Sequence, residues 1–283
     1  PTRPELRAAD RAAAAQVQAQ LDSLVKESRE AQRQTEDLGR AQQRGTESAL
    51  DFEAAKRAEA VAERQEQLLK QAEEVAKALE ELGKSAARAG LNDSAFQQAL
   101  KDVQAQLDQA MSPELRRQLA ELQEALKSLD RERTKEAVRN LGDQQQKLRE
   151  ALERSRELFK RAALEGQLAS LEQESKELVE EQQKWNAEVP AADSASASAQ
   201  ERALAKRADS VAAGLEKAAK QLESPSRREG MEQSADNAKD AANEMRQAAS
   251  ASEKKQAAEA QRSGKRAAGK MQQAQKQVQQ QRE

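Results

Sequence analysis

Residues 54–84, with the sequence AAKRAEAVAERQEQLLKQAEEVAKALEELGK, carry the pattern that decides the fold class. Apolar residues recur there at alternating intervals of four and three, which places their side chains along one face of an α-helix. The stripe, in which Gln65 is the one polar residue, consists of Ala54, Ala58, Val61, Gln65, Leu68, Ala72, Val75, Leu79 and Leu82. Its flanks are also apolar, at Ala62, Leu69, Ala76 and Ala78. A face of this width is typical of a bundle of three or more helices, because a two-stranded coiled coil needs only a narrow seam.

The opposite face of the same helix is charged. Three glutamates there each precede a lysine by four residues, in the pairs Glu66–Lys70, Glu73–Lys77 and Glu80–Lys84. Glu and Lys in this order and spacing stabilise an isolated helix by about 0.2–0.5 kcal/mol per pair. The charges therefore predict a solvent-exposed helix face and not a ligand site.

The composition of the whole chain favours helices throughout. Of the 283 residues, 35% are charged and 1% are aromatic, with no Tyr, one Trp and three Phe. The apolar residues are mostly Ala and Leu, as in long helices and coiled coils, and residues that favour strands are too few for a sheet. Disorder is the competing interpretation, since high charge and low hydrophobicity can keep a chain unfolded. The net charge of only −2 and the apolar periodicity favour order, above all over residues 53–186.

A first helical tract is predicted over residues 1–89. Its early part has its own apolar stripe, which falls out of step with the stripe of residues 54–82 across Gly39 and Gly45. Each glycine destabilises a helix interior by about 1 kcal/mol relative to alanine, so a kink or break is expected over residues 39–45.

Residues 90–130 are predicted to form a short helical hairpin. Gly90 is placed to end the first tract, and Ser94–Gln97 has the spacing of a capping box that begins a helix. The pair Ser112-Pro113 then begins the next helix, as its N-cap and its first helical residue. That helix carries a leucine stripe at Leu115, Leu119, Leu122, Leu126 and Leu129.

The rest of the chain is predicted as a long helix over residues 131–186, a linker over residues 187–199 and an Ala/Gln-rich helical tract over residues 200–283. The linker is rich in Pro, Ala and Ser and is the predicted domain boundary. The last tract is expected to stop once, at Ser224-Pro225. Its basic end is expected to fray unless a partner surface covers it, because alanine buries little apolar area.

Together these segments predict an all-α fold, an elongated antiparallel helical bundle or long coiled coil with the short hairpin as its tip. Three long tracts flank the hairpin. At 1.5 Å per residue, a tract of about 55 residues spans about 80 Å.

The sequence offers no familiar catalytic site, and no enzyme activity is predicted. The chain has no Cys and no His, which excludes disulfides, thiolate catalysis, serine catalysis with a histidine base, and the His-containing metal sites of helical bundles. Aromatic residues are too few to wall a cleft for a sugar substrate. No cofactor, metal or small-molecule substrate is expected.

One motif matches a nucleotide-binding loop in spacing and is rejected. Residues 264–270 fit the pattern G-x-x-x-x-G-K. A P-loop needs Ser or Thr after the lysine to hold Mg²⁺, and a strand before the loop. Here Met271 follows the lysine and Gln/Ala/Lys sequence precedes the motif, so the match is attributed to chance in a low-complexity helix.

The end of the chain is basic. Residues 253–283 contain eight basic residues and three glutamates, a net charge of +5. The basic residues are candidate partner contacts: Lys254, Lys255, Arg262, Lys265, Arg266, Lys270, Lys276 and Arg282. Such an arm can contact nucleic acid or an anionic membrane. An ordinary solvated helix end is the favoured interpretation, because no aromatic residues interleave for base stacking and no bulky apolar face exists for lipid insertion.

The run from Leu50 to Leu82, LDFEAAKRAEAVAERQEQLLKQAEEVAKALEEL, continues through the predicted hairpin into the long Leu/Gln/Glu-rich helix. Over residues 45–186 the sequence resembles the extended coiled-coil region of a bacterial family of uncharacterised membrane-anchored proteins. The resemblance implies membrane segments before Pro1 and a periplasmic location, and it transfers no functional residue. No apolar run of this chain approaches the ~20 residues of a membrane-spanning helix. Since residue 1 is Pro and not Met, the chain is expected to be a piece of a longer protein.

Three functions fit these observations. The first is a structural or scaffolding protein, a spacer, tether or assembly partner that contacts other protein subunits or itself. The second is a binding module whose basic C-terminal tail engages nucleic acid or an anionic membrane. The third is a subunit that becomes ordered only within a larger assembly.

Overall fold

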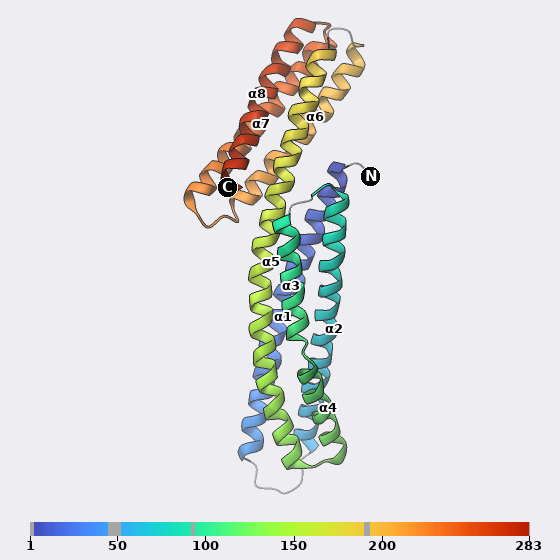
Figure 1. The fold of residues 1–283 in the computed structure, drawn as a ribbon, viewed down its shortest axis with the longest axis vertical. Helices are drawn as coiled ribbons and strands as arrows, with labels where there is room; N and C mark the ends of the chain where they lie inside the picture. Colours follow the sequence, from blue (N-terminus) through green and yellow to red (C-terminus); the bar gives the residue numbers. More distant parts are fainter. Residues whose placement is uncertain (1–2, 45–51, 92–93, 190–192, 283) are drawn as a thin grey trace. The chain divides into compact units, whose positions relative to one another are not determined.

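The structure, a computed structural model, describes residues 3–44, 52–91, 94–189 and 193–282 (Figure 1). These residues form helices and the connections between them, with no strand among them, which confirms the predicted all-α fold. The helices are α1 (Arg3–Arg44), α2 (Phe52–Arg88), α3 (Ser94–Ala110), α4 (Pro113–Ser128), α5 (Arg131–Glu188), α6 (Ser194–Ala219), α7 (Pro225–Glu253) and α8 (Ala257–Arg282).

The chain divides into two compact units, Pro1–Ala163 and Leu164–Glu283. Helices α1 to α4 and the first part of α5 belong to the first unit, and the rest of α5 belongs to the second with α6, α7 and α8. The boundary lies inside α5, whereas the sequence predicts it at the linker of residues 187–199. That part of the chain joins two helices of the same unit, and its second half is helical because α6 begins at Ser194.

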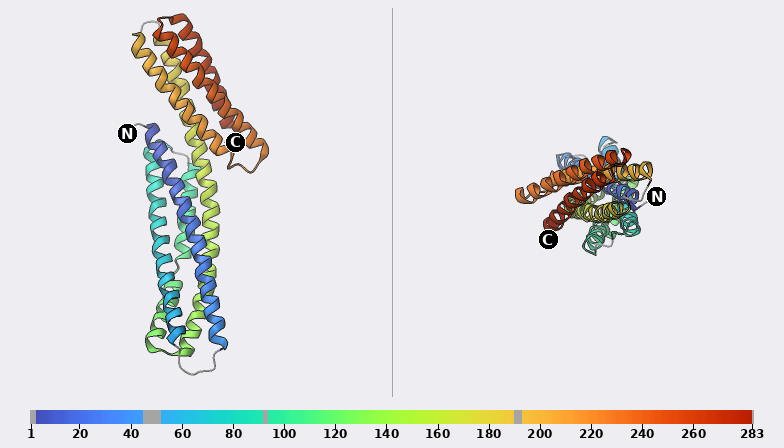
Figure 2. Two further views of the ribbon diagram at one scale, coloured as in Figure 1. Left: turned by 180° about the vertical axis from the view of Figure 1, so that it is seen from behind. Right: turned by 90° about the horizontal axis from the view of Figure 1, so that it is seen from above.

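In the first unit, α1 and α2 run in opposite directions and pack against each other (Figures 1 and 2). α3 and α4 follow one another along α2, and the first part of α5 runs in the direction of α2. Every helix of the unit contributes large apolar residues to one core, in which the predicted stripe of α2 is buried from Ala58 to Leu82. Fully buried examples, one per helix, are Leu21, Leu68, Leu107, Leu122 and Phe159.

The one polar residue of the α2 stripe has a polar partner in this core. Gln145 Nε2 on α5 donates a hydrogen bond of 3.1 Å to Gln65 Oε1, and both side chains are buried. A polar pair inside an apolar interface is satisfied in only one register of the two helices. We infer that this pair fixes the register of α5 against α2.

The arrangement of residues 90–130 differs from the predicted hairpin. α3 and α4 both pack against α2 and extend one after the other along it, without folding back on each other (Figures 1 and 2). Their apolar stripes enter the same core, through Leu107 and Leu122 for example. The sequence predicts which face of each helix is buried but not which neighbour covers it. The long apolar face of α2 offers each short helix more surface than the other short helix does.

Gly90 ends α2 as predicted. It has a φ of +81°, in the left-handed region that favours glycine. The Leu91 N–H donates to the Ala86 carbonyl (2.9 Å), and the Gly90 N–H donates to the Ala87 carbonyl (3.1 Å). These are the two hydrogen bonds of a Schellman motif, which satisfies the last carbonyls of the helix.

The predicted starts of α3, at Ser94, and of α4 are also confirmed. Ser112 Oγ accepts a hydrogen bond from the Leu115 N–H (3.1 Å), and Pro113 is the first residue of α4. Gln97, predicted as part of a capping box in α3, donates from Nε2 to the Gly83 carbonyl of α2 (3.1 Å). It therefore ties α3 to its neighbour.

Part of the break predicted over residues 39–45 lies within the described residues. α1 continues through Gly39 to Arg44, and α2 begins at Phe52 and runs in the opposite direction, so residues 1–89 form two helices instead of one kinked tract. A single glycine destabilises a helix by about 1 kcal/mol, which a long packed helix tolerates. Residues 45–51, with Gly45, lie outside the described residues.

Two of the three predicted ion pairs on α2 form, Glu66–Lys70 (2.8 Å) and Glu80–Lys84 (2.7 Å). Glu73 instead pairs with Arg116 of α4, at 2.7 Å. The hydrogen bond from Arg116 lowers the pKa of Glu73. This pair links two helices of the bundle, which the spacing within α2 alone does not predict.

In the second unit, the tract predicted over residues 200–283 forms the three helices α6, α7 and α8. The pair Ser224-Pro225, predicted to stop a helix, begins one. Ser224 is the N-cap of α7, with its Oγ accepting from the Arg227 N–H (3.5 Å), and Pro225 is the first helical residue. Because α6 has already ended at Ala219, the pair acts as Ser112-Pro113 does in the first unit.

Small residues hold the second unit together. α7 packs closely against both α6 and α8, and seven of its eleven buried residues are alanine. They are Met231, Ser234, Ala235, Ala238, Ala241, Ala242, Met245, Ala248, Ala249, Ala251 and Ser252. Alanine lets two helix backbones approach closely, so many weak dispersion contacts replace a few large side chains. The basic end, expected to fray without a partner surface, is covered by this unit's own helices as far as Arg282.

The leucines predicted as the apolar stripe of α4 give a matched pair of tests, because Leu122 is buried, whereas Leu129, predicted as part of the same stripe, follows the end of α4 and lies outside the core. Leu122→Ala removes a fully buried side chain and should lower the free energy of unfolding by about 2–5 kcal/mol. Leu129→Ala makes the same chemical change at a side chain that is 60% exposed, and should change stability by less than about 0.5 kcal/mol.

Urea unfolding followed by circular dichroism measures both variants. Trp185, the one tryptophan, lies in the second unit, so its fluorescence shows whether that unit is left intact. Equal stability of the two variants would contradict the position of α4 in the core.

Candidate functional site

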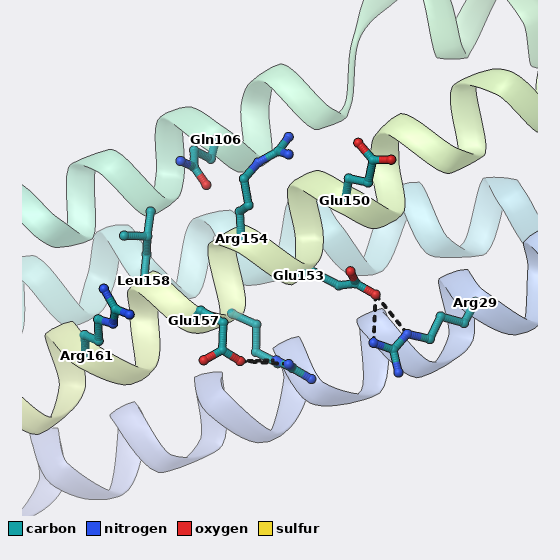
Figure 3. Close-up of a pocket in the computed structure, with 9 residues that line it drawn as sticks. Arg29, Gln106, Glu150, Glu153, Arg154, Glu157, Leu158 and Arg161 are labelled. Atoms are coloured by element: carbon teal, nitrogen blue, oxygen red, sulfur yellow. Dashed lines mark hydrogen bonds and ion pairs between the residues drawn. The ribbon is translucent and has the colours of Figure 1, made fainter. Parts of the chain in front are cut away.

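A groove runs along α5 in the first unit, between this helix and the arm formed by α3 and α4. One part of it, about 690 Å³, is lined by α1, α3 and α5 (Figure 3). The other part, about 490 Å³, is lined by α3, α4 and α5 and shares Gln106 and Arg154 with the first. We call the two parts together the α5 groove. The groove is lined by five basic and four acidic residues together with polar and small ones: Arg29, Gln106, Gln109, Ala110, Ser112, Glu114, Gln144, Lys147, Glu150, Ala151, Glu153, Arg154, Arg156, Glu157, Leu158 and Arg161.

The packing of α3 and α4 explains why this groove is polar. Both helices pack most closely against α2, and their buried residues face the common core. Their side toward α5 carries Gln106 and Gln109, whose amide groups are neutral hydrogen-bonding groups. On α5, Ala151 and Leu158 are only partly buried against the core.

The charges around the groove fall into two groups. Toward α1, Arg29 pairs with Glu153 (2.8 Å), and Arg156 pairs with Glu157 (2.7 Å), so these charges compensate each other (Figure 3). On the side of α3, Lys147, Arg154 and Arg161 are exposed and form no ion pair with any residue that the structure describes. They are seven residues apart along α5. The groove therefore has a row of three uncompensated cations along one wall.

The eight basic residues predicted as partner contacts do not form one free arm. Arg266 pairs with Glu244 (2.9 Å), and Lys270 pairs with Asp240 (3.0 Å), both on α7. Arg282 pairs with Glu165 (2.9 Å) and also with Glu172, both on α5. The remaining five, at the α7–α8 turn and on α8, are exposed: Lys254, Lys255, Arg262, Lys265 and Lys276.

The pairs of Arg282 fasten the end of α8 to α5 within the second unit. Partial burial lowers the pKa of its guanidinium, but hydrogen bonds to Glu172 and Glu165 outweigh burial and raise the pKa overall. The guanidinium of Arg282 is therefore always charged, and its charge stabilises the contact between α8 and α5. Arg282 was predicted as a candidate partner contact because the sequence alone does not place Glu165 and Glu172 beside it.

A buried carboxyl group lies in the second unit, and the sequence analysis missed it. Glu201 on α6 is fully buried, and its Oε1 accepts a hydrogen bond of 2.9 Å from Gln182 Nε2 on α5. Glu201 Oε2, Gln182 Oε1 and Ser198 Oγ are buried without a hydrogen-bond partner among the described residues. Burial raises the pKa of Glu201 from 4.5 to about 8, and the hydrogen bond from Gln182 only partly opposes this.

The sequence did contain a signal for this group. Glu201 lies three residues before Leu204, so it continues the apolar stripe that contains Leu204 and Ala208 toward the start of α6. A glutamate on an apolar stripe is either at the end of the buried face or buried and neutral. Since Ala197, one turn earlier, is also buried, the structure shows that the stripe extends past Glu201.

The motif of residues 264–270 lies within α8 and is helical, not a loop. Gly264 packs against the end of α5: a Cβ there would lie 2.0 Å from Asn186 Oδ1 and 2.9 Å from Trp185 Cζ3. Trp185 is buried, and its Nε1–H donates to the Ala197 carbonyl (2.8 Å). A Cβ at Gly269, by contrast, would meet nothing within 4 Å.

No cluster of three or more acidic residues that could hold a metal ion occurs among the described residues. Likewise, none of the helices in that part of the chain combines the length and the apolar character that crossing a bilayer requires. Comparison of the chain with protein-family models, curated proteins and solved structures gives no match. The resemblance to a membrane-anchored family therefore stays a prediction.

The two glycines of α8 provide a matched test of the packing around Trp185. Gly264→Ala forces Trp185 or Asn186 to move and should destabilise the second unit by about 1–3 kcal/mol. Gly269→Ala adds a methyl group in open space and should stabilise the helix by about 0.5–1 kcal/mol. Unfolding followed by Trp185 fluorescence measures both changes. If Gly264→Ala is as stable as Gly269→Ala, the close approach of α8 to α5 is wrong.

The buried carboxyl predicts a pH dependence of stability in the second unit. Folded Glu201 keeps its proton up to about pH 8, whereas the unfolded chain loses it near pH 4.5. The folded state therefore binds more protons between these values, and stability falls as the pH rises through this window. The loss is on the order of 3–5 kcal/mol, and Glu201→Gln should abolish it.

Denaturant unfolding at pH 5.5 and pH 8, followed by Trp185 fluorescence, measures this dependence. The chain has no histidine and no cysteine, so no other side chain has an ordinary pKa within the window. A wild-type stability that does not change with pH, or the same slope in Glu201→Gln, would show that Glu201 is ionised in the folded state.

Proposed function

We propose that this protein is a non-enzymatic helical scaffold that binds another protein through the α5 groove. The observation that supports the proposal is the row of uncompensated cations along a groove formed by rigid helices. An isolated surface charge usually contributes little to the free energy of binding. A row of charges repeated along a preformed groove, however, fixes both the register and the orientation of a bound partner.

Binding of nucleic acid or anionic membrane through the basic tail is the less favoured alternative. Arg266, Lys270 and Arg282 are paired with acidic residues of their own unit. A polyanion would have to compete with these pairs, and only the remaining cations of the tail are free for it. The proposal of a protein partner instead uses three cations that form no ion pair with a described residue and that follow one another along a single groove.

Site-specific photo-crosslinking in cells that naturally make the protein tests the proposal. A photoreactive amino acid at Gln109, an exposed residue on the wall of the groove, should give a discrete adduct with another polypeptide. The matched control is Lys101, an exposed residue of the same helix that does not line the groove. Adducts of equal yield from both positions, or none from Gln109, would contradict the proposal.

A further inference from the structure

The α5 groove has the features of a site for one additional helix, and this inference rests on the proposed function. We propose that the α5 groove binds an acidic amphipathic helix of a partner protein, which lies along α5 with carboxylates opposite Lys147, Arg154 and Arg161. The spacing of the cations, their lack of an ion pair with any described residue and the residues between the cations each support this assignment.

The spacing of the three cations matches the repeat of a packed helix. Residues seven apart lie on nearly the same face of a helix, about 10 Å apart along its axis. A partner helix with Glu or Asp at seven-residue intervals can place one carboxylate opposite each cation. Charged residues that flank the contact face of paired helices set partner choice and orientation in this way.

Four glutamates also line the groove, and each has another partner: Glu153 pairs with Arg29 and Glu157 with Arg156. Glu150, which lies between Lys147 and Arg154 on α5, accepts a hydrogen bond from Gln146 (3.1 Å) and forms no ion pair with either cation. Glu114, on the α4 wall, accepts a hydrogen bond from Gln118 (2.7 Å). The cations are therefore free to meet carboxylates from outside.

A second row with the same period gives the groove its apolar component. Gln144, Ala151 and Leu158 are also seven residues apart and precede the cations by three positions. Ala110, on the opposite wall, is buried beside them. The rows extend from residue 144 to residue 161, about 26 Å of helix, which a partner helix of about 18 residues would cover.

Two other occupants fit less well. A nucleic acid would gain phosphate contacts, but no aromatic residue lines the groove for base stacking. A second copy of this chain could offer the glutamates of α2, but Glu66, Glu73 and Glu80 are already paired with Lys70, Arg116 and Lys84. An acidic helix of another protein carries no such competitor.

A designed peptide tests the inference. The probe is a fluorescently labelled 18-residue helix with Glu at seven-residue intervals beside an Ala/Leu face, and its binding to the whole chain is measured by anisotropy. The control peptide has the same composition with the glutamates placed irregularly. We expect the regular peptide to bind more tightly than the control by about tenfold, with binding that weakens as salt is added.

Two charge-reversal variants locate the site. Arg154→Glu should weaken binding of the regular peptide by about tenfold or more, because it places like charges opposite each other. Lys160→Glu makes the same change of net charge at an exposed residue of α5 that does not line the groove, and should leave affinity within about twofold. A peptide with Lys in place of its central Glu should regain affinity for Arg154→Glu. Unchanged circular dichroism shows that both variants are folded.

The outcomes separate the two proposals. Equal binding of regular and control peptides, equal effects of the two variants, or tighter binding of single-stranded RNA than of the peptide would overturn the acidic-helix assignment. If the Gln109 crosslink to a protein persists in that case, the scaffold function stands with a partner of different chemistry. If the crosslink is also absent, both proposals fail.

Discussion

Burial of a single apolar face on each helix is the interaction on which the whole structure depends. The chain is poor in large apolar and aromatic residues, so a helix that exposed this face would have little else to offset its conformational entropy. Packing the faces together leaves the charged sides outward, where pairs such as Glu66–Lys70 form. It also explains why α3 and α4 extend along α2: each reaches the largest available apolar surface.

The two units bury their faces in different ways. The first uses leucines and Phe159 and tolerates a polar Gln65–Gln145 pair, whereas alanine is the commonest core residue of the second, beside leucines of α5 and α6 and methionines of α7 and α8. Because the helices of the second unit pack closely, there is no room for a Cβ at Gly264, and the side chain of Glu201 is completely enclosed. The polar features that remain follow from this packing: a buried carboxyl in one unit, and in the other a groove where α3 and α4 turn their polar side toward α5.

Structural features that depend on local periodicity were predicted correctly from the sequence. Features that depend on contacts between residues distant in the sequence were not. The stripe of α2, the Gly90 terminus and the Ser112 cap were all predicted correctly, because each depends on residues within a few turns. The direction of α3 and α4, and the domain boundary inside α5, depend on which apolar faces meet, and apolar stripes are too alike to specify this. Of the candidate site, the tail was predicted by net charge alone, which cannot show that Arg282 is paired. The cations of the groove were not predicted as a binding site, because an ordinary solvent-exposed helix face can carry the same seven-residue repeat of cations.

Amide hydrogen exchange on the 283-residue chain tests most directly the claim that mutual burial of these faces, even alanine faces, orders both units. The measurement compares α7, whose buried residues are mostly alanine and serine, with α2, whose buried residues include leucine and valine. If burial of small residues suffices, amides at the centre of α7 are protected to a degree comparable with those of α2. Exchange of α7 at the rate of an unstructured peptide, with α2 still protected, would contradict the account, because alanine packing would then not hold the second unit together.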